Sequence, residues 1–229
     1  MANEEETAER FVREVLHHCD GFKSVQMFVI VDRVSTDMTR LILDELASSE
    51  PRLRVVWSPE NRCVVDAYVR GYRESLAAGC DWILEIDAGF SHSPDDLPNF
   101  FDKIGRGYDC VFGTRFDKGG RIYDSSLKRR IVSRGGTFLA NLLLRTCLTD
   151  MTSGFEMFSR PALQAVLDRG IASRAHFFQT EIKAYCRNLR FVELPIHYRV
   201  QSSQLAGSAV KDSFQQLWRL FQLRRAGKL

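Results

Sequence analysis

The chain reads Trp82-Ile83-Leu84-Glu85-Ile86-Asp87 near its middle, a short apolar run that ends in an acid. Such a run is typical of a buried strand in an α/β fold, where ligands bind beyond the carboxyl ends of the strands. A carboxylate is costly to bury, so at this position it usually holds a metal, a ligand or a backbone turn. The simplest alternative, an aspartate that only caps the next turn, stays open. Asp87 is therefore the first candidate for a functional residue.

Comparable apolar runs alternate with segments of helical period along the whole chain. The runs predict strands at residues 25–31, 53–57, 82–86, 110–112, 154–158 and 191–198. The helical segments cover residues 4–16, 36–46, 64–78, 93–104, 125–145, 178–187 and about 207–225. This alternation predicts an α/β fold with a mostly parallel central sheet covered by helices. Since no repeat or low-complexity linker divides the chain, we expect one domain over residues 1–229.

Composition excludes several classes of protein. Apolar residues make up 45% and charged residues 27% of the 229 residues, as in an ordinary globular protein. The formal charge of +3 is too small to indicate a nucleic-acid partner. The six cysteines form no CxxC pair, which argues against a zinc site and fits reduced thiols in the cytoplasm. No apolar run approaches the ~18 residues of a membrane span, so we expect a cytoplasmic protein or one bound peripherally to a membrane.

Familiar catalytic motifs are absent from the sequence. It holds no GxGxxG after a strand, no GxxxxGK[ST], no nucleophile elbow and no HExxH. Dinucleotide oxidoreductases, P-loop enzymes, α/β-hydrolases and zinc peptidases of the HExxH type are therefore disfavoured. His92, five residues after Asp87, is a candidate for a direct role, and Asp32 ends the first predicted strand as Asp87 ends the third.

A basic, glycine-containing segment follows the strand at 110–112. Arg115 begins it, and Arg129 and Ser133 stand four apart on the helix at 125–145, so they share one face. A guanidinium beside a hydroxyl suits a phosphate group. The alternative, a solvated charged face, is the usual explanation for such runs.

Several strings, taken together in their order and spacing, resemble family 2 glycosyltransferases. Val31-Asp32-Arg33-Val34-Ser35-Thr36-Asp37 resembles the VDDGSxDGT motif of that family. The other matching strings are residues 64–71, 87–94, 113–116, 126–135 and 150–155. The last two are similar to the polyprenol-phosphate branch, specifically the dolichyl-phosphate mannose synthases, and the resemblance runs from about residue 3 to 220.

The resemblance implies a GT-A fold and an inverting transfer of a hexose from a nucleoside diphosphate sugar to a polyprenyl or dolichyl phosphate. GDP-mannose is the favoured donor, with a divalent cation (Mg²⁺ or Mn²⁺) as cofactor, and the acceptor implies a membrane surface as a further partner. The resemblance implies that Asp87 binds the metal and the diphosphate and that Arg199 contacts the donor diphosphate. It implies that Asp32 and Arg33 contact the nucleoside. The residues implied to hold the acceptor phosphate are Arg115, Arg129 and Ser133. Asn3 and Glu4 match the family's Asn-Glu pair, and Asp150 is a candidate base or sugar-hydroxyl ligand.

The sequence also departs from the family pattern. Gly89 replaces the second acid of Asp-x-Asp, which leaves Ser91 and His92 as candidate helpers of Asp87 at the metal. Met1 nearly abuts the Asn-Glu pair, so we expect the family's first strand to be missing from the sheet. Two alternatives stay open: a transferase of the same fold with a UDP-sugar and another glycolipid acceptor, or a non-catalytic relative that binds a nucleotide. Two helices, at about 125–145 and 207–225, are amphipathic and could face a membrane.

Overall fold

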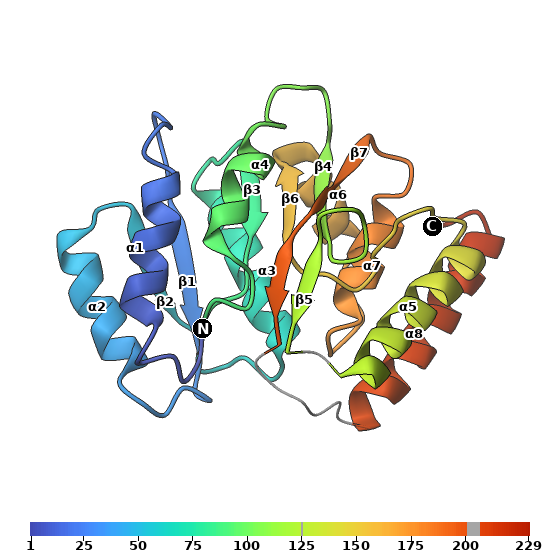
Figure 1. The fold of residues 1–229 in the computed structure, drawn as a ribbon, viewed down its shortest axis with the longest axis horizontal. Helices are drawn as coiled ribbons and strands as arrows, with labels where there is room; N and C mark the ends of the chain where they lie inside the picture. The colour runs from blue at the N-terminus through green and yellow to red at the C-terminus, as the bar shows by residue number, and fades with distance from the viewer. Residues whose placement is uncertain (125, 201–206) are drawn as a thin grey trace.

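The computed structural model describes residues 1–124, 126–200 and 207–229, without the side chains of residues 128, 129 and 207–209. A four-stranded sheet lies at its centre (Figure 1). Its strands are β3 (Trp82–Glu85), β6 (Glu156–Ser159), β4 (Cys110–Thr114) and β7 (Phe191–Pro195), in that order across the sheet. β4 and β7 are parallel, whereas β6 runs antiparallel to both β3 and β4.

Two smaller parallel pairs complete the strands. β1 (Met27–Val31) pairs with β2 (Leu53–Trp57), and β5 (Arg121–Tyr123) pairs with β8 (His197–Arg199). Within the described residues, β1 pairs only with β2, and β3 pairs only with β6, so the inner edges of β1 and β3 have no strand partner. The sheet is therefore interrupted between β1 and β3.

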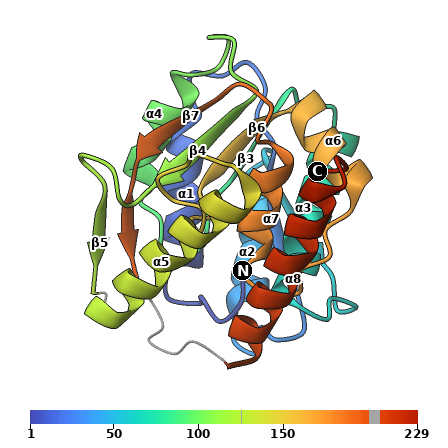
Figure 2. The ribbon, with the colours of Figure 1, turned by 90° about the vertical axis from the view of Figure 1, so that its right-hand side faces the viewer.

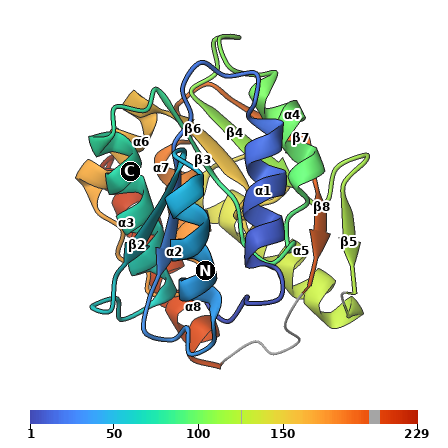
Figure 3. The same ribbon diagram turned by 90° about the vertical axis from the view of Figure 1, so that its left-hand side faces the viewer.

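Helices cover both faces of these strands. Their bounds are α1 (Ala8–His18), α2 (Thr39–Ser49), α3 (Val64–Ala77), α4 (Leu97–Phe101), α5 (Leu127–Leu144), α6 (Arg160–Arg169), α7 (Phe178–Tyr185) and α8 (Gly207–Arg225). Phe11 of α1 and Phe100 of α4 pack against one face of the central sheet. Tyr72, Leu163 and Ile182, from α3, α6 and α7, fill the core under the opposite face. Figure 3 shows α1 and α2 side by side near β1 and β2, and α5 and α8 lie together at the other end of the molecule (Figure 2).

The predicted elements occur in their predicted order, and the strand at 53–57 has its predicted bounds. The run at 191–198, predicted as one strand, forms two strands, β7 and β8, which belong to different sheets. One expectation needs correction: the central sheet is mixed, because β6 enters between β3 and β4 in the opposite direction. An apolar run indicates a buried strand but does not indicate its direction. The sequence also missed β5 and α6, the first because a three-residue strand with exposed ends carries no clear period.

None of the helices in the described ranges is both long enough and apolar enough to pass through a bilayer.

Candidate active site

Asp87 lies just beyond the end of β3, at the carboxyl edge of the interrupted sheet. Two following residues, Gly89 and Phe90, have positive φ angles of 67° and 61°, so the chain turns sharply after the acid. The carboxylate is 31% exposed and accepts a hydrogen bond from the Tyr68 hydroxyl of α3. His92 faces its other oxygen at 3.7 Å. The Asp87 carboxylate is thus oriented by Tyr68, and part of it still faces solvent.

The His92 side chain forms a hydrogen bond with the backbone of this loop. Its Nδ1 accepts the amide N–H of Asp87 at 3.2 Å, and its ring packs at 5.1 Å from Phe155 and 5.2 Å from Tyr198 between ring centroids. The side chain is 1% exposed, and this burial lowers the pKa of His92. The ring is therefore neutral at neutral pH, as its acceptor role requires. Its neighbour Ser91 is also buried, and the Ser91 carbonyl accepts the amide N–H of Arg199 at 2.8 Å.

Arg115 and Asp150 form a buried ion pair at the end of β4. Arg115 Nε and Nη2 donate to the two carboxylate oxygens at 2.7 and 2.9 Å, and the Arg115 amide adds a third bond at 3.1 Å. The side chains are 8% and 0% exposed. Burial opposes the charge on Asp150, but Arg115 outweighs it and holds the pKa of Asp150 below its usual value. Asp150 is therefore ionised at neutral pH, and both of its oxygens accept hydrogen bonds from Arg115, so it suits the positioning of Arg115 better than proton abstraction.

The N-terminal segment forms hydrogen bonds to the loop after β1. The Asn3 side chain donates to the Val34 carbonyl at 3.0 Å and accepts the Thr36 amide at 2.9 Å, while the Glu4 amide donates to Thr39 Oγ1 at 2.7 Å. Asn3 and Glu4 thus fix the shape of the loop that carries Asp32 and Arg33. Asp32 accepts the Val34 amide at 3.1 Å in a local turn, and the Arg33 side chain is exposed.

The remaining candidates lie at the same end of the molecule. Ser133 is half-buried on α5, whereas the side chain of Arg129 falls outside the described residues. Arg199 is the last residue of β8, is 67% exposed, and approaches Asp124 at 3.7 Å. Figure 1 shows the N-terminus, the first turn of α5 and the carboxyl ends of β1 and β7 at this end. The structure gives no direct contact of Ser133 or Arg199 with Asp87.

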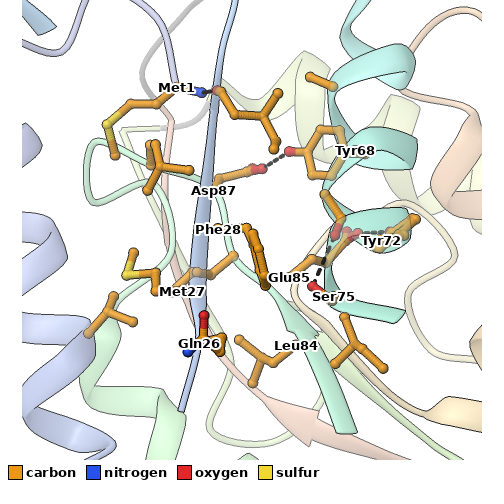
Figure 4. Close-up of a pocket in the computed structure, with 18 of the residues that line it drawn as sticks. Met1, Gln26, Met27, Phe28, Tyr68, Tyr72, Ser75, Leu84, Glu85 and Asp87 are labelled. Atoms are coloured by element: carbon orange, nitrogen blue, oxygen red, sulfur yellow. Dashed lines mark hydrogen bonds between the residues drawn. The ribbon is translucent and has the colours of Figure 1, made fainter. Parts of the chain in front are cut away.

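A buried polar network around Glu85 lies beneath Asp87. Glu85 accepts hydrogen bonds from the Tyr72 hydroxyl and from Gln179 Nε2, the latter at 2.5 Å, and Lys183 Nζ pairs with Glu156 at 2.6 Å. Burial and the nearby Glu156 carboxylate raise the pKa of Glu85 well above its usual value. Glu85 points to Tyr72, and Asp87 to Tyr68, one turn apart on α3 (Figure 4). This i, i+4 pair of tyrosines was the available signal.

Comparison with known proteins now decides the family. A family model described as glycosyl transferase family 2 matches residues 1–167, most of the chain. The chain belongs to glycosyltransferase family 2. It is therefore a glycosyltransferase by family, and Asp87, Asp32 and the Arg115–Asp150 pair lie in the segment that the family model covers.

Two curated relatives lie in the polyprenol-phosphate branch that the sequence resembles. The chain is 27% identical over 217 residues to a polyprenol monophosphomannose synthase of Mycolicibacterium smegmatis, covering 92% of this chain and 80% of the relative. It is 29% identical over 190 residues to an undecaprenyl-phosphate mannosyltransferase of Micrococcus luteus, covering 81% and 78%.

Solved structures with this glycosyltransferase fold confirm the GT-A expectation. A glucosyl-3-phosphoglycerate synthase of Mycobacterium tuberculosis, in complex with Mn²⁺, UDP-glucose and phosphoglyceric acid, superposes with a TM-score of 0.69 at 19% identity. The match covers 99% of this chain and 77% of that one. The shared feature is the fold.

The residues around Asp87 are compatible with one kind of metal site. No group of three or more His, Cys, Asp or Glu side chains gathers as a ready metal site within the described part of the chain. Asp87 nevertheless offers a partly exposed carboxylate, and Mg²⁺ is commonly held by one or two carboxylates together with substrate phosphates and waters. Because His92 Nδ1 already accepts a backbone N–H, these residues suit a cation that would be held jointly by Asp87 and a diphosphate.

Proposed function

We propose that this glycosyltransferase moves a hexose, with inversion, from a nucleoside diphosphate sugar to the phosphate of a polyprenyl or dolichyl lipid. The preferred donor is GDP-mannose, so the sugar transferred would be mannose. The observation that carries the proposal is the joint match to two mannosyltransferases of polyprenyl phosphates along most of their length. The geometry supports it, since an oriented acid and a buried arginine lie at the carboxyl edge of the sheet, where α/β enzymes bind substrates.

The donor half of the reaction is assigned to residues around Asp87. Asp87 would hold a divalent cation, Mg²⁺ or Mn²⁺, which when bound neutralises charge on the leaving diphosphate. Tyr68 holds the carboxylate and the neutral ring of His92 holds the Asp87 backbone amide, with Ser91 next to His92 in the chain. Asp32 and Arg33 would contact the nucleoside, and Arg199 would contact the diphosphate. The loop that carries Asp32 and Arg33 is held by hydrogen bonds from the segment of Asn3 and Glu4.

The acceptor half is assigned to a cationic group: Arg115, Arg129 and Ser133 would orient the lipid phosphate. A phosphate monoester is largely ionised at pH 7, because its second pKa is about 6. It therefore needs orientation and charge compensation more than a strong base. The carboxylate of Asp150, whose two oxygens accept hydrogen bonds from Arg115, agrees with a mechanism in which no side chain of the pair removes a proton.

We also propose that α5 and α8 rest on the membrane that holds the acceptor. Exposed apolar side chains recur along one side of α5, namely Leu127, Ile131, Phe138 and Leu142, each 62–73% exposed. α8 adds Phe214 at 63% and Trp218 at 58%. Arg130, Arg134, Lys211 and Arg225 are exposed on the same two helices, and Arg145 is exposed directly after α5. Apolar side chains interspersed with cations suit an anionic bilayer surface.

The docking proposal predicts that Phe138→Ser combined with Trp218→Ser lowers affinity for vesicles by at least about tenfold, because each aromatic loses burial on the order of 1.5 kcal/mol. Binding is measured by co-sedimentation with vesicles of phosphatidylcholine and phosphatidylglycerol. The matched control, Leu41→Ser with Phe22→Ser, changes two side chains that are 59% and 40% exposed near the opposite end of the molecule. Unchanged binding by the first variant, or equal losses in both, would rule out docking through α5 and α8.

The catalytic proposal is tested by incubating the chain with nucleotide sugars and polyprenyl phosphate, scoring sugar on lipid phosphate. Transfer from GDP-mannose supports it. Transfer only from a UDP-sugar to another glycolipid would favour the same-fold alternative, and nucleotide binding without any turnover would favour a non-catalytic relative.

A further inference from the structure

Tyr198, in the middle of β8, lies between the two halves of the candidate site. Its ring centroid is 5.2 Å from that of His92, and the guanidinium carbon of Arg115 lies 5.3 Å from the centre of the same ring. His92 holds the backbone amide of Asp87, and Arg115 pairs with Asp150. Tyr198 therefore contacts both the loop assigned to the donor and the arginine assigned to the acceptor.

The backbone around Tyr198 fixes its position relative to the loop after β3. The amide of Arg199 donates to the Ser91 carbonyl at 2.8 Å, and the amide of Ser93 donates to the His197 carbonyl at 3.2 Å. At Tyr198 the two segments form an antiparallel bridge. On its other side, β8 pairs in parallel with β5. Because β8 is bonded on both sides, it can present the Tyr198 side chain in a defined place.

The Tyr198 side chain points away from those of its two neighbours along the strand, since successive side chains alternate between the faces. His197 Nδ1 lies 2.9 Å from a carboxylate oxygen of Asp96, and Arg199 is 67% exposed. Tyr198 is instead half-buried, and it lines the same cavity as Asp87. Its side chain therefore lies on the side of β8 that faces the site.

The phenol of Tyr198 acts on the charges around this cavity. Burial and the carboxylate of Asp87 raise the pKa of Tyr68 well above its usual value, and the nearby Tyr198 phenol adds to this effect. Burial opposes the charge on Arg115, but Asp150 outweighs it and raises the pKa of Arg115, with further contributions from Tyr198 and Asp87. Tyr198, Tyr68, Asp87 and Arg115 therefore lie close enough to influence one another's ionisation.

An inverting transfer requires the hexose to lie between the donor diphosphate and the acceptor phosphate. The attacking oxygen approaches the anomeric carbon from the face opposite the leaving group. With the diphosphate at Asp87 and the lipid phosphate at Arg115, the hexose would lie between these two residues, where Tyr198 borders the space. A tyrosine hydroxyl both donates and accepts hydrogen bonds, so it suits the hydroxyl groups of a sugar.

We propose that the Tyr198 hydroxyl forms a hydrogen bond with the hexose of the donor, between the Asp87 loop and Arg115. The inference rests on the proposed function, because that function places a phosphate group on either side of the sugar. In the alternative, purely structural role, the Tyr198 ring only packs between His92 and Arg115. The two roles differ in one respect: the ring contacts survive removal of the hydroxyl, whereas the sugar contact does not.

The test compares Tyr198→Phe with the matched control Tyr108→Phe. Tyr198→Phe keeps the ring and removes only the hydroxyl. Tyr108 is also half-buried, but it lies before β4, at the end of that strand opposite the site. Calorimetry with Mn²⁺ and without acceptor measures the Kd of GDP-mannose and the Kd of GDP for each variant. UDP-glucose and UDP are measured in the same way.

The ratio of the Kd for the nucleotide sugar to the Kd for the nucleotide reports the contact with the hexose. We expect this ratio to rise about fivefold or more in Tyr198→Phe, because one hydrogen bond to the sugar is lost. The Kd for the nucleotide and the Tm should change little. Tyr108→Phe should leave the ratio within about twofold of that of the unaltered chain.

An unchanged ratio in Tyr198→Phe, or equal losses of affinity for the nucleotide and the nucleotide sugar, would overturn the inference and leave Tyr198 a packing role. Sugar transfer by the unaltered chain tests the proposed function separately. Transfer together with an unchanged ratio would overturn only the role of Tyr198. Absence of binding of any nucleotide sugar to the unaltered chain would overturn both.

Discussion

The Asp87→Asn variant is expected to transfer sugar at least about a thousandfold more slowly than the unaltered chain, with little change in Tm. Asparagine keeps the shape of the side chain and an oxygen that can accept the Tyr68 hydroxyl, so the loop should hold its form. It removes the single carboxylate that the described residues place at the carboxyl edge of β3 for a diphosphate-bound cation. Because Gly89 supplies no second acid, no neighbour in that motif can compensate.

Asp44→Asn is the matched control for this variant. Asp44 lies on α2 beside Arg40, is 48% exposed, and is remote from the site, so the rate should stay within about twofold. Rates are compared at saturating metal and donor, and then as a function of Mn²⁺ concentration. A rate for Asp87→Asn within tenfold of the unaltered chain would remove Asp87 from the catalytic machinery.

The second large effect is expected on stability, from the Arg115–Asp150 pair. Asp150→Ala should lower the free energy of unfolding by about 3–5 kcal/mol, because it leaves a buried guanidinium without its carboxylate. The double variant Arg115→Met with Asp150→Leu should recover most of this loss, since an apolar pair of similar volume has no charge to compensate. Denaturant unfolding of Arg115→Met, Asp150→Leu and the double variant measures the coupling.

Activity separates the two roles of Arg115. If Arg115 orients the lipid phosphate, the stable double variant should show a KM for polyprenyl phosphate raised about tenfold or more, with the KM for the donor little changed. A double variant as active as the unaltered chain would leave the pair a purely structural role. Additive losses of stability in the two single variants would contradict the buried pair itself.

The pH dependence of this contribution has a defined sign. The pKa of Asp150 is lowered in the folded protein from its ordinary 3.8, so the ion pair stabilises the fold above that value. The contribution is lost as the pH falls through the lower pKa of the folded state. The stability difference between the unaltered chain and Asp150→Asn should therefore be constant near pH 7 and shrink in acid below about pH 4.

The local features of this fold could be predicted because they depend on neighbouring residues. The run 53–57 gave β2 its bounds, and the acid after residue 86 led to Asp87. The direction of β6 could not be predicted, because it depends on which strands flank it and not on its own residues.

The part of the site that could not be predicted from the sequence is the set of contacts between residues far apart in the chain. Arg115 and Asp150 were both candidates from the sequence, but their pairing joins positions 35 apart and changes what each can do. The same holds for Tyr68 and Asp87, since a tyrosine on an amphipathic helix gives no sign of which acid it meets. The predicted cluster at the carboxyl edge of the sheet gained its geometry only from the tertiary structure.

We propose that this chain transfers a sugar to a lipid phosphate. The most direct measurement uses the purified chain, Mn²⁺, GDP-mannose and undecaprenyl phosphate in vesicles, with the anomeric configuration of the product determined by NMR. We expect a mannosyl phospholipid with inverted configuration, formed by the unaltered chain and lost in Asp87→Asn. Transfer with retention, or no transfer to lipid phosphate from GDP-mannose or any UDP-sugar, would contradict it.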